Sequence, residues 1–334
     1  MLYYGGLLMI SKYIHRYNHQ QGFTLIELMI SLILGLLVSA AVIQIYLINV
    51  KTSSIQSSGS ELQDASIFGL QQLEKKLRIA NLGNPTTQIT STTVNGGIVL
   101  TAANLGITTA YANTAYLTRR EGDSASGTNG WTGISNTNVN SDQLTIQYTN
   151  TTGSVMSDCE GADAAVNDIV VERYFLRRAT GDTSSGNIKN LVLACDAGRV
   201  SPTGGGILTV GTASDSRNFG TAGQEFIINV DQFKVLLGTK SSAAASAGQM
   251  MYLPSSSYLL MATKPSITAV KIGLIVHGTT PIIGSNDQSS FTLLGQSNSL
   301  KTDTTRQQQV RTSYESTTLL RNARVIDVDT SLTP

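Results

Sequence analysis

Hydrophobic and polar positions divide the chain into an N-terminal helical part and a C-terminal part made of short strands. From Leu28 to Ile48 there are 21 consecutive residues without a charge. At 1.5 Å of rise per residue this run is about 32 Å long as a helix, sufficient to cross a bilayer core of about 30 Å. Because no proline occurs between Phe23 and Asn84, the pattern predicts one helix from Phe23 to about Leu82.

The second half of this helix is predicted to be amphipathic. The sequence from Asn81 to Pro85 indicates its end, because Gly83 suits a left-handed cap and Pro85 cannot continue the helix. Phe68 falls on the polar face, where it either contacts a neighbouring subunit or reaches under a loop. The apolar face is expected to carry Ile55, Leu62, Leu70, Leu73, Leu77 and Ala80, and the opposite face Glu61, Asp64, Gln71, Lys75 and Arg78.

From residue 84 onward the pattern changes to short β runs separated by polar loops. Leu144, Ile146 and Tyr148 alternate with polar residues, as in a half-buried antiparallel sheet. The fold class is therefore α+β, with a long helix packed on a large antiparallel β domain. The predicted strands are Gly97–Thr101, Ala115–Arg120, Gln143–Tyr148, Asp168–Leu176, Asn190–Cys195, Glu225–Leu237, Ile267–Val276 and a last one within Arg306–Val328; the segments Gly122–Gly130, Gly211–Gly220 and Ser241–Gly248 are predicted to be loops.

Composition argues against several classes of function. Charged residues make up 13% of the chain, and 23 Lys and Arg balance 22 Asp and Glu, which gives no basic excess for nucleic-acid binding. Of the three histidines, His15 and His19 lie in the N-terminal stretch before the apolar run, which we expect to be removed. Any histidine-based triad in the remaining chain would therefore have to use His277. No motif of a nucleotide-binding loop, a zinc protease or a serine hydrolase occurs. We therefore expect no enzyme activity, no catalytic residue, no cofactor and no bound metal.

The residues before the apolar run indicate its orientation. Residues 1–22 contain Lys12 and Arg16 and no acid, whereas the region after the run contains acids, which favours a cytoplasmic N-terminus. An ordinary secretory signal does not fit, since its apolar stretch would precede the cleavage site and end at small residues. Here a short basic leader ends in Gly22, and the apolar stretch follows it.

The run Gly22-Phe23-Thr24-Leu25-Ile26-Glu27-Leu28 closely resembles the class III signal of type IV pilins. The resemblance implies that a prepilin peptidase cleaves after Gly22, that Phe23 becomes N-methylated, and that Glu27 is the acid at the fifth mature position. An ordinary membrane anchor is the alternative interpretation. Translation from Met9 instead of Met1 would shorten the leader to 14 residues, and either start leaves 312 of the 334 residues in the mature chain.

Glu27 has a physical explanation within this resemblance. A carboxylate near the membrane costs about 2.5–3.5 kcal/mol, so such acids usually have a partner. Phe23 and Glu27 are four residues apart, on one face of the predicted helix. In an assembled fibre the family's glutamate is thought to meet the N-terminal amine of a neighbouring subunit. For an unassembled subunit, a carboxylate that extends to the membrane surface is the alternative.

Within the pilins, the C-terminal region resembles PilW-type minor pilins. The similar runs are Ser141–Tyr148, Val230–Gly238, Val270–Val276 and Arg311–Asn322. The resemblance implies a leader at 1–22, a membrane or fibre-core half of the helix at 23–50, an amphipathic half at 51–83 and a periplasmic domain at 84–334. The implied location is the bacterial inner membrane, crossed once, and then the pilus at the cell surface.

Cys159 and Cys195 are the only cysteines and enclose a loop of about 37 residues. Two cysteines in an exported domain favour a disulfide, with free buried thiols as the alternative. The acids Asp158, Glu160, Asp163 and Asp168 surround Cys159 and form either a Ca²⁺ site or, as we expect, a solvated loop. His277 is expected to be structural.

Two small basic groups leave room for DNA contact, although charges at strand edges that discourage unwanted pairing explain them as well. The first group is Arg173, Arg177 and Arg178, and the second is Lys301, Arg306, Arg311, Arg321 and Arg324.

The sequence and the two resemblances predict a minor pilin that primes pilus assembly and joins the tip complex. The implied partners are the prepilin peptidase, other minor pilins, the major pilin and the inner-membrane assembly platform, with a large tip adhesin as a further candidate. Nucleic acid is not expected as a partner. A type II secretion pseudopilin, and an adhesin or DNA receptor displayed on a pilus, are the alternatives.

Overall fold

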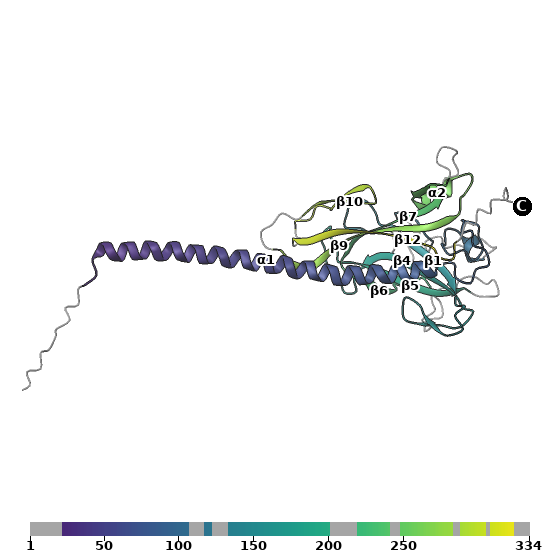
Figure 1. Cartoon of the computed structure of the whole chain (residues 1–334), viewed down its shortest axis with the longest axis horizontal. Helices are drawn as coiled ribbons and strands as arrows, with labels where there is room; N and C mark the ends of the chain where they lie inside the picture. Colours follow the sequence, from purple (N-terminus) through teal and green to yellow (C-terminus); the bar gives the residue numbers. More distant parts are fainter. Residues whose placement is uncertain are drawn as a thin grey trace, which may run out of the picture. The chain divides into compact units, whose positions relative to one another are not determined.

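The computed structural model describes residues 22–106, 117–121, 133–200, 219–240, 248–282, 288–304 and 308–323, without the side chains of residues 64–66. It divides into two compact units, Met1–Thr52 and Ser53–Pro334. Figure 1 shows the elements of each unit along the chain. The antiparallel sheets and the long N-terminal helix confirm the predicted α+β class.

The long helix α1 spans Leu25–Ile79, close to the predicted range. It begins after Thr24, whose hydroxyl accepts a hydrogen bond from the amide of Glu27 at 3.3 Å. It ends where Asn81 takes a left-handed backbone conformation, with φ at 66°. Gly83 is also left-handed, but the helix has ended before it is reached.

Within the described residues, the large apolar side chains of α1 in the first unit are exposed. Each of these side chains from Leu25 to Ile48 is at least 51% exposed. By length and composition, α1 contains a segment apolar enough to cross a membrane, with a mean hydropathy of 2.5. This segment presents apolar side chains in all directions, so only lipid or other apolar helices suit its surface.

The second unit contains two four-stranded antiparallel sheets. The first has the order β1-β4-β5-β6, with β1 at Leu144–Thr149, β4 at Ile169–Arg178, β5 at Leu191–Val200 and β6 at Gln224–Ile227. The second has the order β12-β9-β7-β8, with β12 at Gln309–Leu319, β9 at Ile267–Pro281, β7 at Val230–Lys240 and β8 at Met250–Leu253.

The second unit also contains two short hairpins and two short helices among the described residues. The hairpin of β10 (Ser290–Leu293) and β11 (Gln296–Ser299) packs on the second sheet, where Leu293 lies against Gly273 of β9. A second hairpin pairs β2 (Met156–Ser157) with β3 (Asp163–Ala164). Two short helices, η1 at Ala102–Leu105 and α2 at Ser255–Leu260, complete the elements.

One core holds the second half of α1 and both sheets together. Leu62, Leu73, Leu77 and Ala80 of α1 are at most 4% exposed. They belong to the same buried cluster as side chains from each sheet, including Tyr174 and Leu193 from the first and Phe233 and Leu274 from the second. The predicted apolar face of the helix therefore does pack on the domain, although Ile55 remains 39% exposed.

The structure departs from the predicted strands in several places. The run Glu225–Leu237 is divided at Asn229, whose φ of 58° separates β6 from β7 and sends them to different sheets. Gly97–Thr101 forms only an isolated bridge, between Ile98 and Ile146. Of Ala115–Arg120, the first two residues lie outside the described part, and Arg119 makes one bridge to Gln143. The strand β8 and the β10–β11 hairpin were not predicted.

The side chain of Asn81 joins the end of α1 to three other segments, of which the one at Asn322 is distant in sequence. Its side-chain amide donates to the carbonyl oxygens of Thr86, at 3.0 Å, and Asn322, at 2.9 Å. Its side-chain oxygen accepts from the amide of Gly97 at 2.9 Å. Because Asn81 is only 1% exposed, losing these bonds would leave buried polar groups without partners.

We expect Asn81→Ala to lower the free energy of unfolding by about 3 kcal/mol, from the lost hydrogen bonds together with left-handed strain. Asn229→Ala is the matched control, because Asn229 is also left-handed but is only half-buried. The control should lose about 1 kcal/mol. Urea denaturation of the full chain in detergent measures both values, and equal losses would contradict the role of the Asn81 side chain.

Candidate functional site

The N-terminal residues of the pilin motif lie at the start of α1. Residues 1–21 lie outside the described part, and Phe23 is 83% exposed. Thr24 caps the helix and Glu27 occupies its first turn, where the helix dipole favours a negative charge. Phe23 precedes the first helical residue, so the shared helical face expected for Phe23 and Glu27 is absent from this structure.

Glu27 is the sole charged residue between Leu25 and Val50. Its side chain is exposed and has no partner among the described residues. A lone carboxylate at the end of an apolar helix is unfavourable in lipid unless a cation reaches it. The described part of the subunit therefore offers both an apolar surface and an acid that has no partner there.

Polar contacts attach the second half of α1 to both sheets. Glu61 accepts hydrogen bonds from the hydroxyl groups and amides of Thr279 and Thr280 at the end of β9. These bonds, those of the Thr279 hydroxyl first, lower the pKa of Glu61 to about 2. Glu74 accepts from the Ser316 hydroxyl of β12. The prediction that Glu61 lies on the face away from the domain is wrong, because these threonines recruit its carboxylate.

A third attachment lies deeper in the domain. The ammonium group of Lys76 is 2.8 Å from a carboxylate oxygen of Glu172 on β4, whose side chain is fully buried. The hydroxyl groups of Tyr148 and Tyr174 also donate to Glu172, at 2.9 and 2.7 Å. Burial and the charge of Glu172 raise the pKa of both tyrosines, so their hydroxyls remain donors. No local pattern predicts this network, since Lys76 and Tyr148 are far from Glu172 along the chain.

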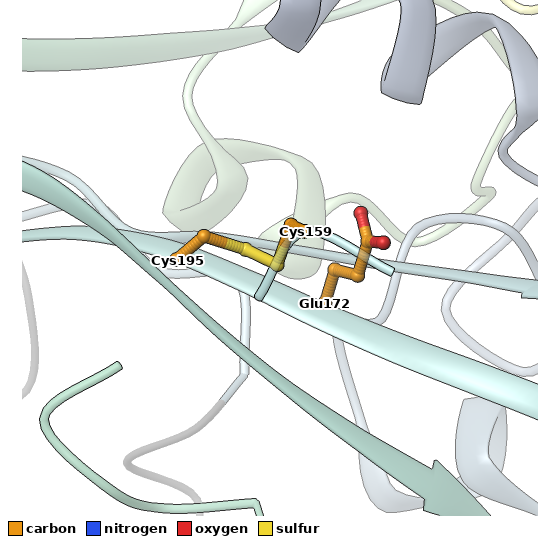
Figure 2. Close-up of side chains that lie close together, drawn as sticks. All are labelled: Cys159, Glu172 and Cys195. Atoms are coloured by element: carbon orange, nitrogen blue, oxygen red, sulfur yellow. A yellow bond between two sulfur atoms is a disulfide. The ribbon is translucent and has the colours of Figure 1, made fainter. Parts of the chain in front are cut away.

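The two cysteines are joined by a disulfide, which Figure 2 shows beside the side chain of Glu172. Their Cα atoms are 6.1 Å apart, and Cys195 lies on β5 opposite Tyr174. Cys159, Cys195 and Glu172 lie close enough together to suggest a metal site. In this state, however, both sulfur atoms are bonded to each other, and the carboxylate is occupied by Lys76 and two tyrosines. These three residues therefore form a structural cluster.

The acids around Cys159 are only partly solvated: Asp163 is exposed, whereas Glu160 and Asp168 are half-buried. Asp158 is buried and pairs with Arg199 at 2.9 Å. Its other oxygen accepts from the amides of Glu160 and Ala162. Asp168 faces the same guanidinium at 3.5 Å, and the backbone oxygen of Asp163 accepts from it. An arginine thus occupies the position in which a cation was considered, and it fixes the disulfide loop to β5.

His277 belongs to a buried polar cluster within the second sheet. Its Nδ1 atom is 3.2 Å from Asp231, which also pairs with Arg311 at 2.8 Å. Asn136 donates to the other oxygen of Asp231 at 2.7 Å. Burial opposes ionisation of Asp231, but His277, Arg311 and Asn136 outweigh it and lower its pKa to about 2. His277 lies within β9, not at its end, because β9 continues to Pro281.

Half of the six described basic residues considered for DNA contact are buried in the domain. Arg173 is fully buried, pairs with Asp196 at 2.8 Å and stacks on Phe175. Arg177 and Arg311 are each 6% exposed. Arg178, Lys301 and Arg321 are exposed, whereas Arg306 and Arg324 lie outside the described residues. The buried arginines cannot contact a nucleic acid, and they are not charges at free strand edges either.

Comparison with known proteins agrees with this arrangement. Residues 17–43 match the prokaryotic N-terminal methylation motif, and residues 203–322 match the family of type IV pilus-assembly protein W. By these two matches the chain resembles type IV pilin-like proteins, and its C-terminal part resembles the PilW type. The second match covers the whole of the β12-β9-β7-β8 sheet.

Other comparisons add less. Among solved structures, the chain is similar to a type IV-like pilin from Thermus thermophilus, with 10% identity and a TM-score of 0.30. That alignment covers 55% of this chain and 78% of the other. No curated protein shows significant similarity.

We expect the stability of the domain to fall as pH rises, because of Glu160. Burial, followed by repulsion from Asp196 and Asp158, raises the pKa of Glu160 from 4.5 to about 7. The protonated form is therefore favoured in the folded state, and its contribution is lost between about pH 4.5 and 7. Glu160→Gln retains an acceptor for the Ala197 amide and should be more stable than the unsubstituted protein at pH 8, by on the order of 1 kcal/mol after screening, with no gain at pH 4.

Urea denaturation of the full chain in detergent at the two pH values measures this difference. Asp163→Asn is the matched control, since Asp163 is an exposed acid of the same loop and should change little at either pH. An identical pH profile for Glu160→Gln and the unsubstituted protein would contradict the assignment.

We expect the double substitution Cys159→Ser and Cys195→Ser to lower the free energy of unfolding by about 4 kcal/mol. The disulfide closes a loop with a sequence separation of 36 residues, and the loss follows from the restored freedom of the unfolded chain. Thermal denaturation with and without reductant measures the effect. Reductant should bring the unsubstituted protein to the stability of the double variant and leave that variant unchanged; sensitivity of the variant to reductant would refute the assignment.

Proposed function

We propose that this protein is a PilW-type minor pilin that primes the assembly of a type IV pilus and remains in the complex at its tip. The prepilin peptidase cleaves after Gly22, and the new N-terminal Phe23 is N-methylated. The mature subunit then associates with other minor pilins and the major pilin on the inner-membrane assembly platform. A large adhesin is a further candidate partner at the tip. The role is structural, through association of subunits.

One observation carries this proposal: within the described residues, the apolar surface of the first half of α1 is exposed and its one acid, Glu27, has no partner. Every large apolar side chain from Leu25 to Ile48 contributes to this exposed surface. A bundle of similar helices would cover that surface. The N-terminal amine created by cleavage after Gly22 would supply a cation for Glu27 of a neighbouring subunit. Together, these two contacts would fix the helices side by side in one register.

The remaining features support a single membrane span with the domain outside the cytoplasm. The basic leader favours a cytoplasmic N-terminus, and a disulfide persists in an oxidising compartment. We propose a leader at 1–22, a membrane or fibre-core half at 23–50, an amphipathic half at 51–83 and a periplasmic domain at 84–334. The domain is tied to the amphipathic half through Glu61, Glu74 and Lys76.

We expect Glu27→Ala to leave processing intact but to reduce co-purification with other minor pilins at least tenfold, because the register contact is lost. Glu27→Gln should behave like the alanine variant, since an amide has no charge to pair with an amine. Gln44→Ala, a polar position in the same apolar half, is the matched control and should co-purify normally. Mass spectrometry of each variant should show a mature N-terminus at methylated Phe23.

Two results would oppose the proposal. Normal co-purification of the Glu27→Ala variant would remove the register contact. An intact bond between Gly22 and Phe23 in the unsubstituted protein, in both membranes and sheared pili, would indicate a plain membrane anchor. Mature protein confined to the membrane fraction would instead favour an assembly factor or a secretion pseudopilin.

A further inference from the structure

We propose that the outer face of the second sheet, beside β8, binds an extended and uncharged apolar segment from the β domain of another pilin subunit. The segment would add to the free edge of β8 and place an apolar side chain in the neighbouring pocket. We call this surface the β8 groove and define it by Leu236, Tyr252, Pro254, Leu293 and Leu294. It deepens the proposed function, because it assigns a specific contact to the assembly of subunits.

The β8 groove contains a pocket of about 340 Å³. Leu236 and Tyr252 come from the sheet, whereas Leu293 and Leu294 come from the β10–β11 hairpin that packs on it. The hairpin lies on the sheet face that carries Lys234, because Gly273, which Leu293 contacts, is the register partner of Lys234. The pocket therefore opens on the outer face of the sheet, opposite the core.

The charged groups at this pocket are already paired. Lys234 lies 2.7 Å from Asp142, and Arg120 lies 3.1 Å from Glu121. Asp142 also accepts from the amides of Val235 and Glu121, each at 2.8 Å. Since each charge has its counterpart within the pocket, the site presents no net charge to a ligand. An uncharged apolar side chain suits it best.

The strand edge and the pocket lie on the same face. Tyr252 of β8 is the register partner of Gly238 on β7, and the Tyr252 ring covers Gly238. Side chains alternate along a strand, so Tyr252 and Met250 point to the same side as Leu236. Within the described residues β8 pairs with β7 alone, which leaves its outer edge without a strand partner.

This edge lacks the usual protection against pairing. Proteins commonly place lysine or other charges on free edge strands, but β8 consists of Met250, Met251, Tyr252 and Leu253. Met250 and Tyr252 are 39% and 38% exposed, and Leu260 at the end of the adjoining α2 is 87% exposed. Apolar side chains gathered at an unpaired edge mark an interaction surface.

The edge also indicates the kind of partner. Its outward amides and carbonyls need main-chain partners, which an extended peptide segment supplies. A lipid does not present a regular row of amide and carbonyl groups. The backbone amides and carbonyls of a helix are already hydrogen-bonded to one another within the helix. The occupant is therefore an extended segment of a β domain and not the apolar helix of a neighbour.

Photo-crosslinking in cells that make the complete set of pilins tests the proposal. The full chain would carry p-benzoylphenylalanine in place of Tyr252, or in place of Val155, an exposed control position far from the groove in sequence. We expect crosslinks from position 252 at least tenfold above those from position 155. Mass spectrometry should locate them in another pilin, beyond its apolar helix.

Each other outcome overturns the proposal. Crosslinks to the same chain would mean that its own residues cover the edge, and crosslinks to an apolar helix or to lipid would assign a different partner. Equal crosslinking at the two positions would mean that the groove is unoccupied.

A charge at the edge provides an independent test. Met250→Lys should reduce co-purification with other pilins at least tenfold, whereas Val166→Lys, at another exposed position, should not. Because Met250 is the register partner of Lys240, the substitution should also lower the melting temperature by about 2 °C, too little to unfold the domain. If Glu27→Ala disrupts association and Met250→Lys does not, the role of the β8 groove is refuted and the proposed function is retained. If neither disrupts association, both fall.

Discussion

The structure depends on one constraint: a single helix must suit two different environments. Seventeen large apolar side chains between Leu25 and Ile48 are exposed, and burying each is worth about 1.5–3 kcal/mol. Their sum is tens of kcal/mol, several times the net stability of an ordinary domain. Water is therefore not a workable surrounding for this half of α1. The remainder of the molecule has to keep the helix folded while leaving that surface available for lipid or other subunits.

The second half of α1 meets this constraint through a combination of apolar and polar contacts. Leu73, Leu77 and Ala80 supply burial, which is strong but has no direction. Glu61, Glu74 and Lys76 supply direction, because they bind β9, β12 and β4 respectively. A helix that slid or rotated would break all three attachments and leave Glu172 as an unpaired buried charge. The polar contacts thus fix one position and rotation of the helix on the sheets, whereas apolar packing alone would allow many.

Local patterns in the sequence predicted what is locally encoded. The limits of α1, strands β1, β4, β9 and β12, and the pilin motif each depend on residues close together in the chain. The buried charges were misread because their partners are distant: Arg311 pairs with Asp231, and Arg173 with Asp196. Charged residues are expected at the surface when no partner is visible. Asn81 was treated as part of a stop signal, since nothing nearby reveals that it holds Gly97 and Asn322. The strand β8 and the β10–β11 hairpin are too short for their alternation to stand out.

The two candidate contact surfaces carry different kinds of information. The apolar half of α1 is alike on all sides, so it can drive association but discriminates poorly between helices of similar composition. Discrimination has to come from surfaces with shape and directional bonding, and these lie in the β domain. An unpaired strand edge can pair with the wrong strand and cause aggregation when many other strand edges are nearby. Here the edge extends over only four residues and is followed by Pro254, which limits the length of segment that can pair with it. A short strand edge beside a pocket without net charge can therefore discriminate between partner segments by their amino-acid sequence. Association of the apolar helices brings the candidate partner close enough for this contact to form.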